Sequence, residues 1–229
     1  EYKERIWEAE QQLREIEDRL EQKRQELQEQ QEARKQKMFA LSVMENQANL
    51  LHDPDTPAYG PDNAKVAVIE FFDYQCVFCS RFAPELEKVM KAQPDVRYLF
   101  KEWPIFAGRW EASLQAAQQG LTVWQKKGPQ AYVTYHNAIY ATGHNEGKLT
   151  AEDIHGAASK AGLTTPAPGD HTASLEKNSN LAEALGLTGT PGIIVMPVTG
   201  ATPETITVFP EAVTAEKLQA AIRKATRVK

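Results

Sequence analysis

The sequence contains little cysteine: only Cys76 and Cys79 occur among its 229 residues. Two cysteines are too few for a small secreted scaffold that is held together by several disulfides. A zinc site would require two more cysteine or histidine ligands, and the five histidines show no recognisable ligand spacing. We therefore expect no metal site. The informative feature is the separation of the two cysteines by two residues.

Long apolar runs and an excess of positive charge are also missing. No run of 18 or more apolar residues is available to form a membrane-spanning helix. The formal net charge is -5, whereas binding to a nucleic-acid backbone relies on clustered lysine and arginine. Integral membrane proteins and nucleic-acid-binding proteins are therefore excluded, and the composition is typical of a soluble globular protein.

Glycine and proline are absent before Pro54, and residues 1–40 contain 11 acidic and 9 basic side chains. This composition predicts a long solvated helix. The chain opens at Glu1 inside this pattern without an initiator methionine, which fits a processed or trimmed protein. Apolar residues recur with heptad spacing, at Ile6, Leu13, Leu20 and Leu27 in position a and at Ala9 and Ile16 in position d.

The apolar stripe is interrupted in its middle by polar residues at core positions, namely Lys23, Gln30, Arg34 and Lys37. Burying such charges in a tight coiled coil is costly, so we expect a loosened middle. A helix of about 50 residues would extend roughly 75 Å, too long for one ordinary domain to cover. We expect residues 1–51 to form an oligomerisation helix. The alternative is an amphipathic helix that folds back on its own domain.

Three prolines and a glycine between residues 52 and 64 end this helix and predict a linker. A catalytic domain is expected over residues 65–229, and it begins with a β-α-β unit. The strands are expected at 65–72, 96–102, 192–197 and 205–209, with helices at 79–92 and 215–224. Helical patterns between about 109 and 187, with turns at 120, 128–129, 143 and 166–169, predict a helical insert.

The two cysteines stand where the first strand gives way to a helix. Cys76 would face the unpaired N–H groups and the positive dipole end of the first helical turn, which favour a thiolate. Cys79, one turn further along, would be less exposed and would displace the mixed disulfide. The spacing therefore predicts a thiol–disulfide exchange centre with Cys76 as nucleophile and Cys79 as resolving thiol.

The segment Glu70-Phe71-Phe72-Asp73-Tyr74-Gln75-Cys76-Val77-Phe78-Cys79 resembles the active-site segment of the Dsb family of bacterial periplasmic oxidoreductases. Gly189-Thr190-Pro191 is similar to the family's cis-proline loop, which lies against the cysteine pair. This resemblance covers about residues 53–227. It implies an α/β protein with a thioredoxin fold and an inserted helical domain, here preceded by a long helix. It also implies a periplasmic location and a redox-active disulfide without another cofactor. The partners that it implies are client proteins with disulfides and a membrane redox partner.

Two charged residues in the predicted strands also match positions of this family. Glu70 lies six residues before Cys76, where the resemblance implies a buried acid that assists proton transfer at the resolving cysteine. Lys101 matches a lysine that neighbours that acid. An acid inside an apolar strand is expensive to bury unless it is paired or functional. The alternative is an edge-strand glutamate that points to water.

The direction of the reaction depends on redox poise and on the surfaces around the centre. The Val77-Phe78 dipeptide lacks the histidine of the strong oxidant DsbA, and Thr190 before the proline resembles the isomerases DsbC and DsbG. We therefore expect a disulfide isomerase or reductase, with a DsbA-like dithiol oxidase as the alternative. A dimer is favoured, and a trimer as in ScsC-like relatives stays open. A third interpretation is an interaction protein with an idle cysteine pair.

Overall fold

A computed structural model of the chain describes residues 1–164 and 169–227. The chain divides into two compact units, Glu1–Met38 and Phe39–Lys229, which are considered separately below. Most of the turn expected at 166–169 lies outside the described residues.

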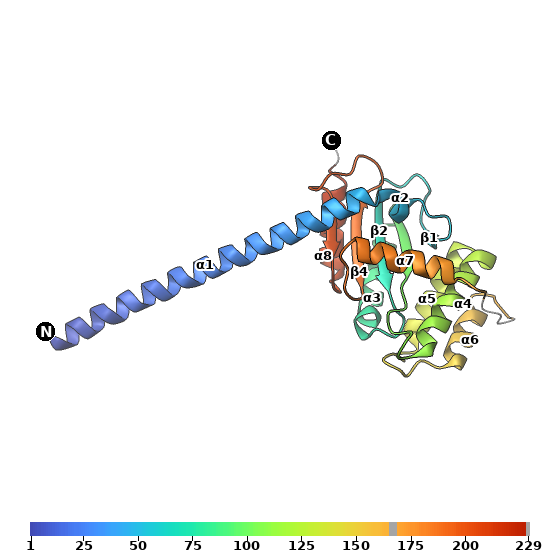
Figure 1. The fold of residues 1–229 in the computed structure, drawn as a ribbon, viewed down its shortest axis with the longest axis horizontal. Coiled ribbons are helices and arrows are strands. Elements are labelled where there is room, and N and C mark those ends of the chain that lie inside the picture. Colours follow the sequence, from blue (N-terminus) through green and yellow to red (C-terminus); the bar gives the residue numbers. More distant parts are fainter. Residues whose placement is uncertain (165–168, 228–229) are drawn as a thin grey trace. The chain divides into compact units, whose positions relative to one another are not determined.

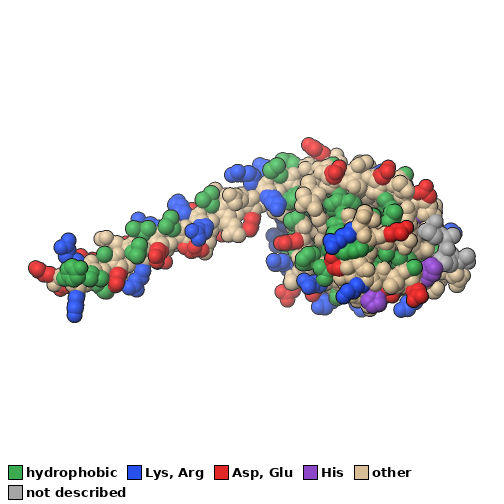
Figure 2. All heavy atoms as spheres, turned by 60° about the horizontal axis from the view of Figure 1, so that its bottom comes forward, with side chains coloured by type: hydrophobic (Ala, Val, Ile, Leu, Met, Phe, Trp, Pro, Cys, Tyr) green, Lys and Arg blue, Asp and Glu red, His purple; other side chains and the backbone are tan. Residues whose placement is uncertain are grey.

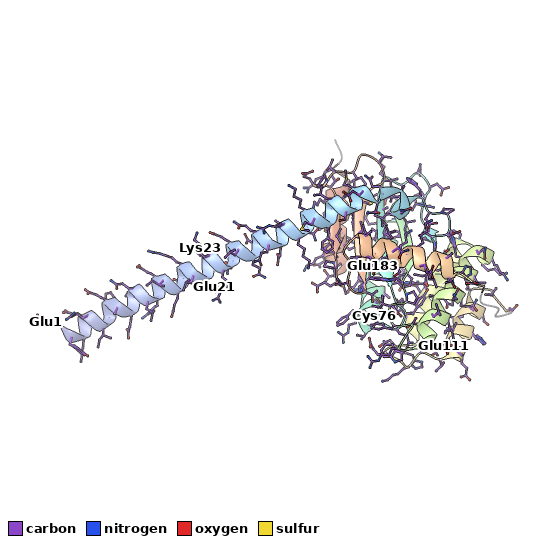
Figure 3. The ribbon with its side chains drawn as sticks, in the orientation of Figure 1. Glu1, Glu21, Lys23, Cys76, Glu111 and Glu183 are labelled. Carbon is purple, nitrogen blue, oxygen red and sulfur yellow. The ribbon has the colours of Figure 1, made fainter. Side chains whose placement is uncertain are left out.

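The first unit is a single helix, the greater part of α1 (Tyr2–Glu45). Acidic, basic and apolar side chains alternate along its surface (Figure 2). Lys23, in the middle of the predicted stripe, is exposed (Figure 3). Its Nζ lies 3.6 Å from a carboxylate oxygen of Glu26. The apolar residues of the stripe are also exposed within the single chain: Ile6, Leu13, Ile16, Leu20 and Leu27. This unit therefore lacks a core of its own.

The second unit is built around a five-stranded sheet with helices on both faces (Figure 1). Its strands are β1 (Ala58–Tyr59), β2 (Val66–Phe72), β3 (Arg97–Glu102), β4 (Gly192–Pro197) and β5 (Thr207–Phe209). Its helices, after the end of α1, are α2 (Gln47–Leu51), α3 (Val77–Ala92), α4 (Glu111–Lys127), α5 (Pro129–Ala141), α6 (Ala151–Lys160), α7 (Thr172–Ala184) and α8 (Ala215–Ala225).

The sheet has the order β1-β3-β2-β4-β5, with β2 and β3 parallel and the other pairs antiparallel. All seven residues of β2 are buried, as expected for a central strand covered on both faces. Because side chains alternate along a strand, Val68 and Phe72 join the core beneath α3, α5 and α8, whereas Ile69 and Phe71 join the core on the opposite face. That opposite face is covered by α7, α2 and the end of α1.

The end of the long helix belongs to the core of the second unit. The sequence predicts one helix through residue 51, but α1 ends at Glu45 and α2 follows as a separate short helix. Phe39, Val43 and Leu50 are buried in the same core as Phe71. Removal of these apolar side chains from water stabilises the unit. The second unit therefore begins at residue 39, and not after residue 51.

The expected linker, residues 52–64, also contributes to the sheet. Ala58 and Tyr59 form the edge strand β1 and pair with β3. Gly60 has a φ of 112° and lies so close to the Val96 carbonyl that an added Cβ would meet it. This close approach explains why a glycine follows the edge strand.

Lys101 lies beneath this segment, on the face of the sheet that packs against α2. Its Nζ donates to the Asn49 carbonyl at 2.9 Å and to Thr56 Oγ1 at 2.6 Å, and it lies 3.9 Å from an Asp53 carboxylate oxygen. Burial lowers the pKa of Lys101 to about 8, with the Asp53 charge opposing that shift. The buried ammonium therefore ties residues 49–56 to the central sheet.

We expect the substitution Lys101→Met to lower the free energy of unfolding by about 3 kcal/mol, because it leaves buried acceptors without their donor. Urea denaturation of the reduced protein measures the change. Lys91→Met is the matched control, since Lys91 is exposed and pairs with Glu87 on the surface. Its loss should stay below about 1 kcal/mol. Equal small losses in both variants would contradict a structural role for Lys101.

Candidate active site

The turn between β2 and α3 is fixed by the buried carboxylate of Asp73. Its Oδ1 accepts hydrogen bonds from the Gln75 N–H at 2.8 Å and from Ser113 Oγ at 2.9 Å. Its Oδ2 accepts from the Phe106 N–H at 3.0 Å, and its carbonyl accepts from the Cys76 N–H at 3.1 Å. One aspartate therefore holds the strand end, the start of α4 and the nucleophilic cysteine in a single arrangement.

Cys76 is the N-cap residue of α3, at the end of the helix where backbone N–H groups lack helical partners (Figure 3). The pKa of its thiol is lowered to about 6, first by a hydrogen bond from the Cys79 thiol and further by the backbone N–H groups of Cys79 and Phe78. Burial opposes this shift. Cys76 is therefore largely a thiolate at neutral pH.

The antiparallel pairing of β2 with β4 brings a distant loop to this thiol. Phe71 pairs with Gly192, so the residues just before β4 lie beside the residues just after β2. The Thr190–Pro191 peptide bond is cis. The Cys76 sulfur lies 3.4 Å from the Thr190 carbonyl oxygen, to which it donates when it is protonated. The register of two strands therefore joins the two motifs, which are more than 100 residues apart in the sequence.

Cys79 is buried within the first helical turn, and both cysteines are free thiols. Burial raises the pKa of Cys79 well above its ordinary value, and the neighbouring Cys76 and Glu70 charges raise it further. The exposed fraction differs little between the two side chains, at 3% for Cys76 and 1% for Cys79. The two thiols are therefore distinguished by their electrostatic surroundings more than by their exposure.

Glu70 lies on the α3 face of the sheet and is buried. Burial raises its pKa, and His136 of α5 opposes the shift. The distance between His136 Nε2 and Glu70 Oε1 is 3.8 Å. Because the Glu70 charge also raises the pKa of Cys79, the acid is electrostatically coupled to the resolving thiol. The alternative of an exposed edge-strand glutamate is wrong, since β2 is central and Glu70 is 3% exposed.

Lys101 does not neighbour Glu70. In the parallel register of β2 and β3, Glu70 pairs with Phe100, and Lys101 pairs with Phe71. Side chains alternate between the faces of a sheet, so Lys101 and Glu70 point to opposite faces. The structure thus corrects the expected acid–lysine pair, and His136 is the basic side chain found beside the acid.

His136 is one of the five histidines that were weighed only as metal ligands, and its place in the active site was not predicted. The imidazole is buried among aromatic rings, those of Phe72, Tyr74, Phe100, Tyr132 and Tyr140. A signal was present in the spacing of Tyr132, His136 and Tyr140, which places all three on one helical face. Glu102 was missed as well. It is a third buried acid beside Glu70 and Asp73, and it accepts a hydrogen bond from Tyr132 at 3.0 Å.

Two further properties bear on the kind of protein. Across the described residues, 1–164 and 169–227, no cluster of three or more histidine, cysteine, aspartate or glutamate side chains could hold a metal ion. In the same part of the chain, no helix combines the length and the apolar character needed to cross a membrane.

We expect iodoacetamide to alkylate Cys76 with a half-maximal rate near pH 6, because the rate follows the thiolate fraction. Cys79 should remain unmodified there, because its pKa is raised. Peptide mass mapping after brief labelling between pH 4 and 9 gives both profiles. The Cys76→Ser variant is the control and should lose the labelling near pH 6. Faster labelling of Cys79 would reverse the assignment.

Comparison with known proteins is consistent with this geometry. The chain matches the model of a thioredoxin family over residues 52–224. Among curated protein sequences, no significant relative was found.

Solved structures extend the comparison. BcfH of Salmonella enterica Typhimurium has 38% sequence identity and a TM-score of 0.79, over 93% of this chain and 91% of that chain. The catalytic domain of Proteus mirabilis ScsC has 26% identity and a TM-score of 0.70, over 82% and 99%. A periplasmic thioredoxin-like protein from Salmonella enterica serovar Typhimurium has 29% identity and a TM-score of 0.66, over 78% and 95%. These matches confirm the predicted fold class, and the chain belongs to the thioredoxin-like thiol–disulfide oxidoreductases of the Dsb family.

Proposed function

We propose that this oxidoreductase is a periplasmic disulfide isomerase or reductase that acts on client proteins through a mixed disulfide at Cys76. The observation that carries the proposal is the contrast between the two thiols. Cys76 has a pKa lowered to about 6, whereas the pKa of Cys79 is raised. A thiolate with a pKa near the ambient pH is the best attacking group, and a protonated second thiol allows time for the client to rearrange.

In the proposed reaction, the Cys76 thiolate attacks one sulfur of a client disulfide and the other sulfur leaves as a client thiolate. For isomerisation, a different client thiolate then attacks the mixed disulfide and releases Cys76, so the number of disulfides is unchanged. For reduction, Cys79 loses its proton and attacks the Cys76 sulfur. This second route leaves a Cys76–Cys79 disulfide and a reduced client. The cysteine pair is thus the redox group, and we propose no further cofactor.

Glu70 is the proposed acceptor of the Cys79 proton. Its pKa is raised by burial, which brings a carboxyl closer to the neutral range in which a general base works efficiently. Its charge is felt at Cys79. His136, at 3.8 Å from the carboxyl, stabilises the ionised form of the acid. Thr190 and Pro191 are proposed to shape the surface that receives the client beside Cys76.

Residues 1–38 are proposed to join copies of this chain into a homo-oligomer. The carrying observation is the exposed heptad stripe on a helix that has no core of its own. Two or more linked active sites raise the effective concentration of thiols around a bound client, which favours repeated attack. A dimer is favoured here, and a trimer is the second arrangement. We propose in addition that a membrane redox partner keeps Cys76 reduced.

The periplasmic location rests on a relative, since the Salmonella protein with 29% identity is described as periplasmic. A DsbA-like dithiol oxidase is the second candidate function. The lowered pKa of Cys76 favours it, because a stable thiolate stabilises the reduced protein and makes its disulfide a better oxidant. The redox potential separates the two candidates. A value approaching roughly -120 mV would favour the oxidase, and a value nearer -270 mV would favour the reductase.

We expect Glu70→Gln to slow the attack of Cys79 on a Cys76–glutathione mixed disulfide by about 10-fold or more at pH 7, because general-base assistance is lost. The rate should recover as the pH rises, since hydroxide then removes the Cys79 proton. Stopped-flow measurement of glutathione release reports the step. The exposed Glu87→Gln change on α3 is the control. An unchanged rate and pH profile would exclude Glu70 as the base.

We expect the double change Leu13→Glu and Leu20→Glu to convert an oligomer into a monomer, because it places charges at two a positions of the stripe. Light scattering should give two or three times the 25.6 kDa chain mass before the change and one chain after it. The variant should keep insulin reduction and lose most isomerisation of scrambled ribonuclease.

The matched control is Gln11→Glu with Gln25→Glu, which adds the same charge at f positions, away from the stripe. This control should remain oligomeric. A monomeric unaltered chain at micromolar concentration would contradict the coiled-coil proposal. A chain shortened to begin at Met38 tests the same point while keeping Phe39, Val43 and Leu50 in the core.

A further inference from the structure

The loop between α5 and α6 contains a residue in an unusual backbone conformation. Glu146 has a φ of 53°. Among the described residues, it is the only non-glycine residue with a positive φ. This left-handed region costs a residue with a side chain roughly 1 kcal/mol, and glutamate is not one of the types that commonly adopt it. A specific set of contacts must therefore hold Glu146 in this conformation.

The contacts that hold the loop come from Gln75, the residue directly before Cys76. The Gln75 carbonyl accepts from the Glu146 N–H at 2.9 Å. Its side-chain Oε1 accepts from the Gly147 N–H at 2.8 Å and from the Leu149 N–H at 3.4 Å. Gln75 itself is fully buried. The loop is thus fastened to the active-site turn.

This fastening directs the Glu146 carboxylate to the first backbone N–H of the active-site helix. Its Oε1 accepts from the Val77 N–H at 3.0 Å. The next two N–H groups of the same turn, those of Phe78 and Cys79, act on the Cys76 sulfur. The N-terminus of α3 is therefore shared between two anions, a carboxylate from the helical insert and the reactive thiolate.

The charge of Glu146 acts within this turn. It raises the pKa of Asp73, whose carbonyl accepts from the Cys76 N–H. A second negative charge at the same helix end also opposes the positive potential that favours a thiolate. The other titratable groups of this region are Cys79 on α3, which donates to Cys76, Asp73 in the turn, and Glu70 on β2, whose charge acts on Cys79.

We propose that Glu146 is a positioning residue that opposes stabilisation of the Cys76 thiolate by the N-terminus of α3 and so keeps the protein from becoming a strong oxidant. A less stable thiolate raises the free energy of the reduced form and makes the Cys76–Cys79 disulfide less oxidising. It also makes Cys76 a better nucleophile and a slower leaving group. This inference deepens the proposed isomerase or reductase function and rests on it for its biological meaning.

A purely structural cap is the competing account, and the substitution Glu146→Gln separates the two. Glutamine retains an oxygen that can accept from the Val77 N–H but carries no charge. Removing the charge should lower the pKa of Cys76 by about half a unit, as expected for an exposed carboxylate acting over a short distance. Thiolate absorbance at 240 nm, recorded during a pH titration of the reduced full-length protein, measures this shift.

The redox equilibrium provides a second readout. Half a pKa unit corresponds to an about threefold shift toward the reduced form in a glutathione equilibrium, or roughly 15 mV. Repeating the titration in 1 M salt should shrink the difference between the two proteins, because salt screens exposed charges. Glu216→Gln is the matched control, since it removes an exposed acid from the first turn of α8. It should leave the Cys76 pKa unchanged.

Glu146→Ala removes the charge and the acceptor together, so its Cys76 pKa should fall at least as far as in Glu146→Gln. A Cys76 pKa that is unchanged in Glu146→Gln would overturn the inference, as would a shift that persists fully in 1 M salt. The titration needs no client protein and no oligomer. A failed isomerisation assay with a shifted Cys76 pKa would therefore count against the proposed function and leave the role of Glu146 intact.

Discussion

The chemistry of this protein depends on the backbone N–H groups at the start of α3, which lack helical partners and attract anions. Cys76 occupies the N-cap position and is stabilised as a thiolate by two of these groups. Glu146 accepts from a third. Two more residues hold this arrangement: Asp73 fixes the turn, and Thr190 lies against the sulfur. A small shift of the helix end would alter the charge on the nucleophile.

The buried charged residues on the two faces of the sheet have different roles. On the α3 face, Glu70 lies beside His136 and acts on Cys79. On the opposite face, Lys101 is satisfied by Asn49, Thr56 and Asp53, and it connects the chain before β1 to the central strands. Burial destabilises the charged form in both cases. The position on one face or the other decides whether a buried charge can act on the cysteines.

The division of the chain into two units separates the chemistry from the proposed assembly. The unit Phe39–Lys229 contains the sheet and both cysteines, and it has its own core. The unit Glu1–Met38 exposes its apolar side chains and gains nothing from burial within a single chain. The proposed association of such helices would supply the missing burial, and it would not alter the residues that set the thiol chemistry.

The sequence by itself determined the secondary structure around the cysteines, because local patterns decide where a buried strand ends and an amphipathic helix begins. It also predicted which thiol has the lowered pKa, since the helix N-terminus is a local property. Only the tertiary structure decided the partners of the buried acids. The register of β2 and β3 sends Lys101 to the face opposite Glu70, and α5 brings His136 to that acid from a distant part of the chain. Strand alternation and long-range packing control these contacts, and neither the position of Glu146 at Val77 nor the burial of Phe39 can be read from neighbouring residues.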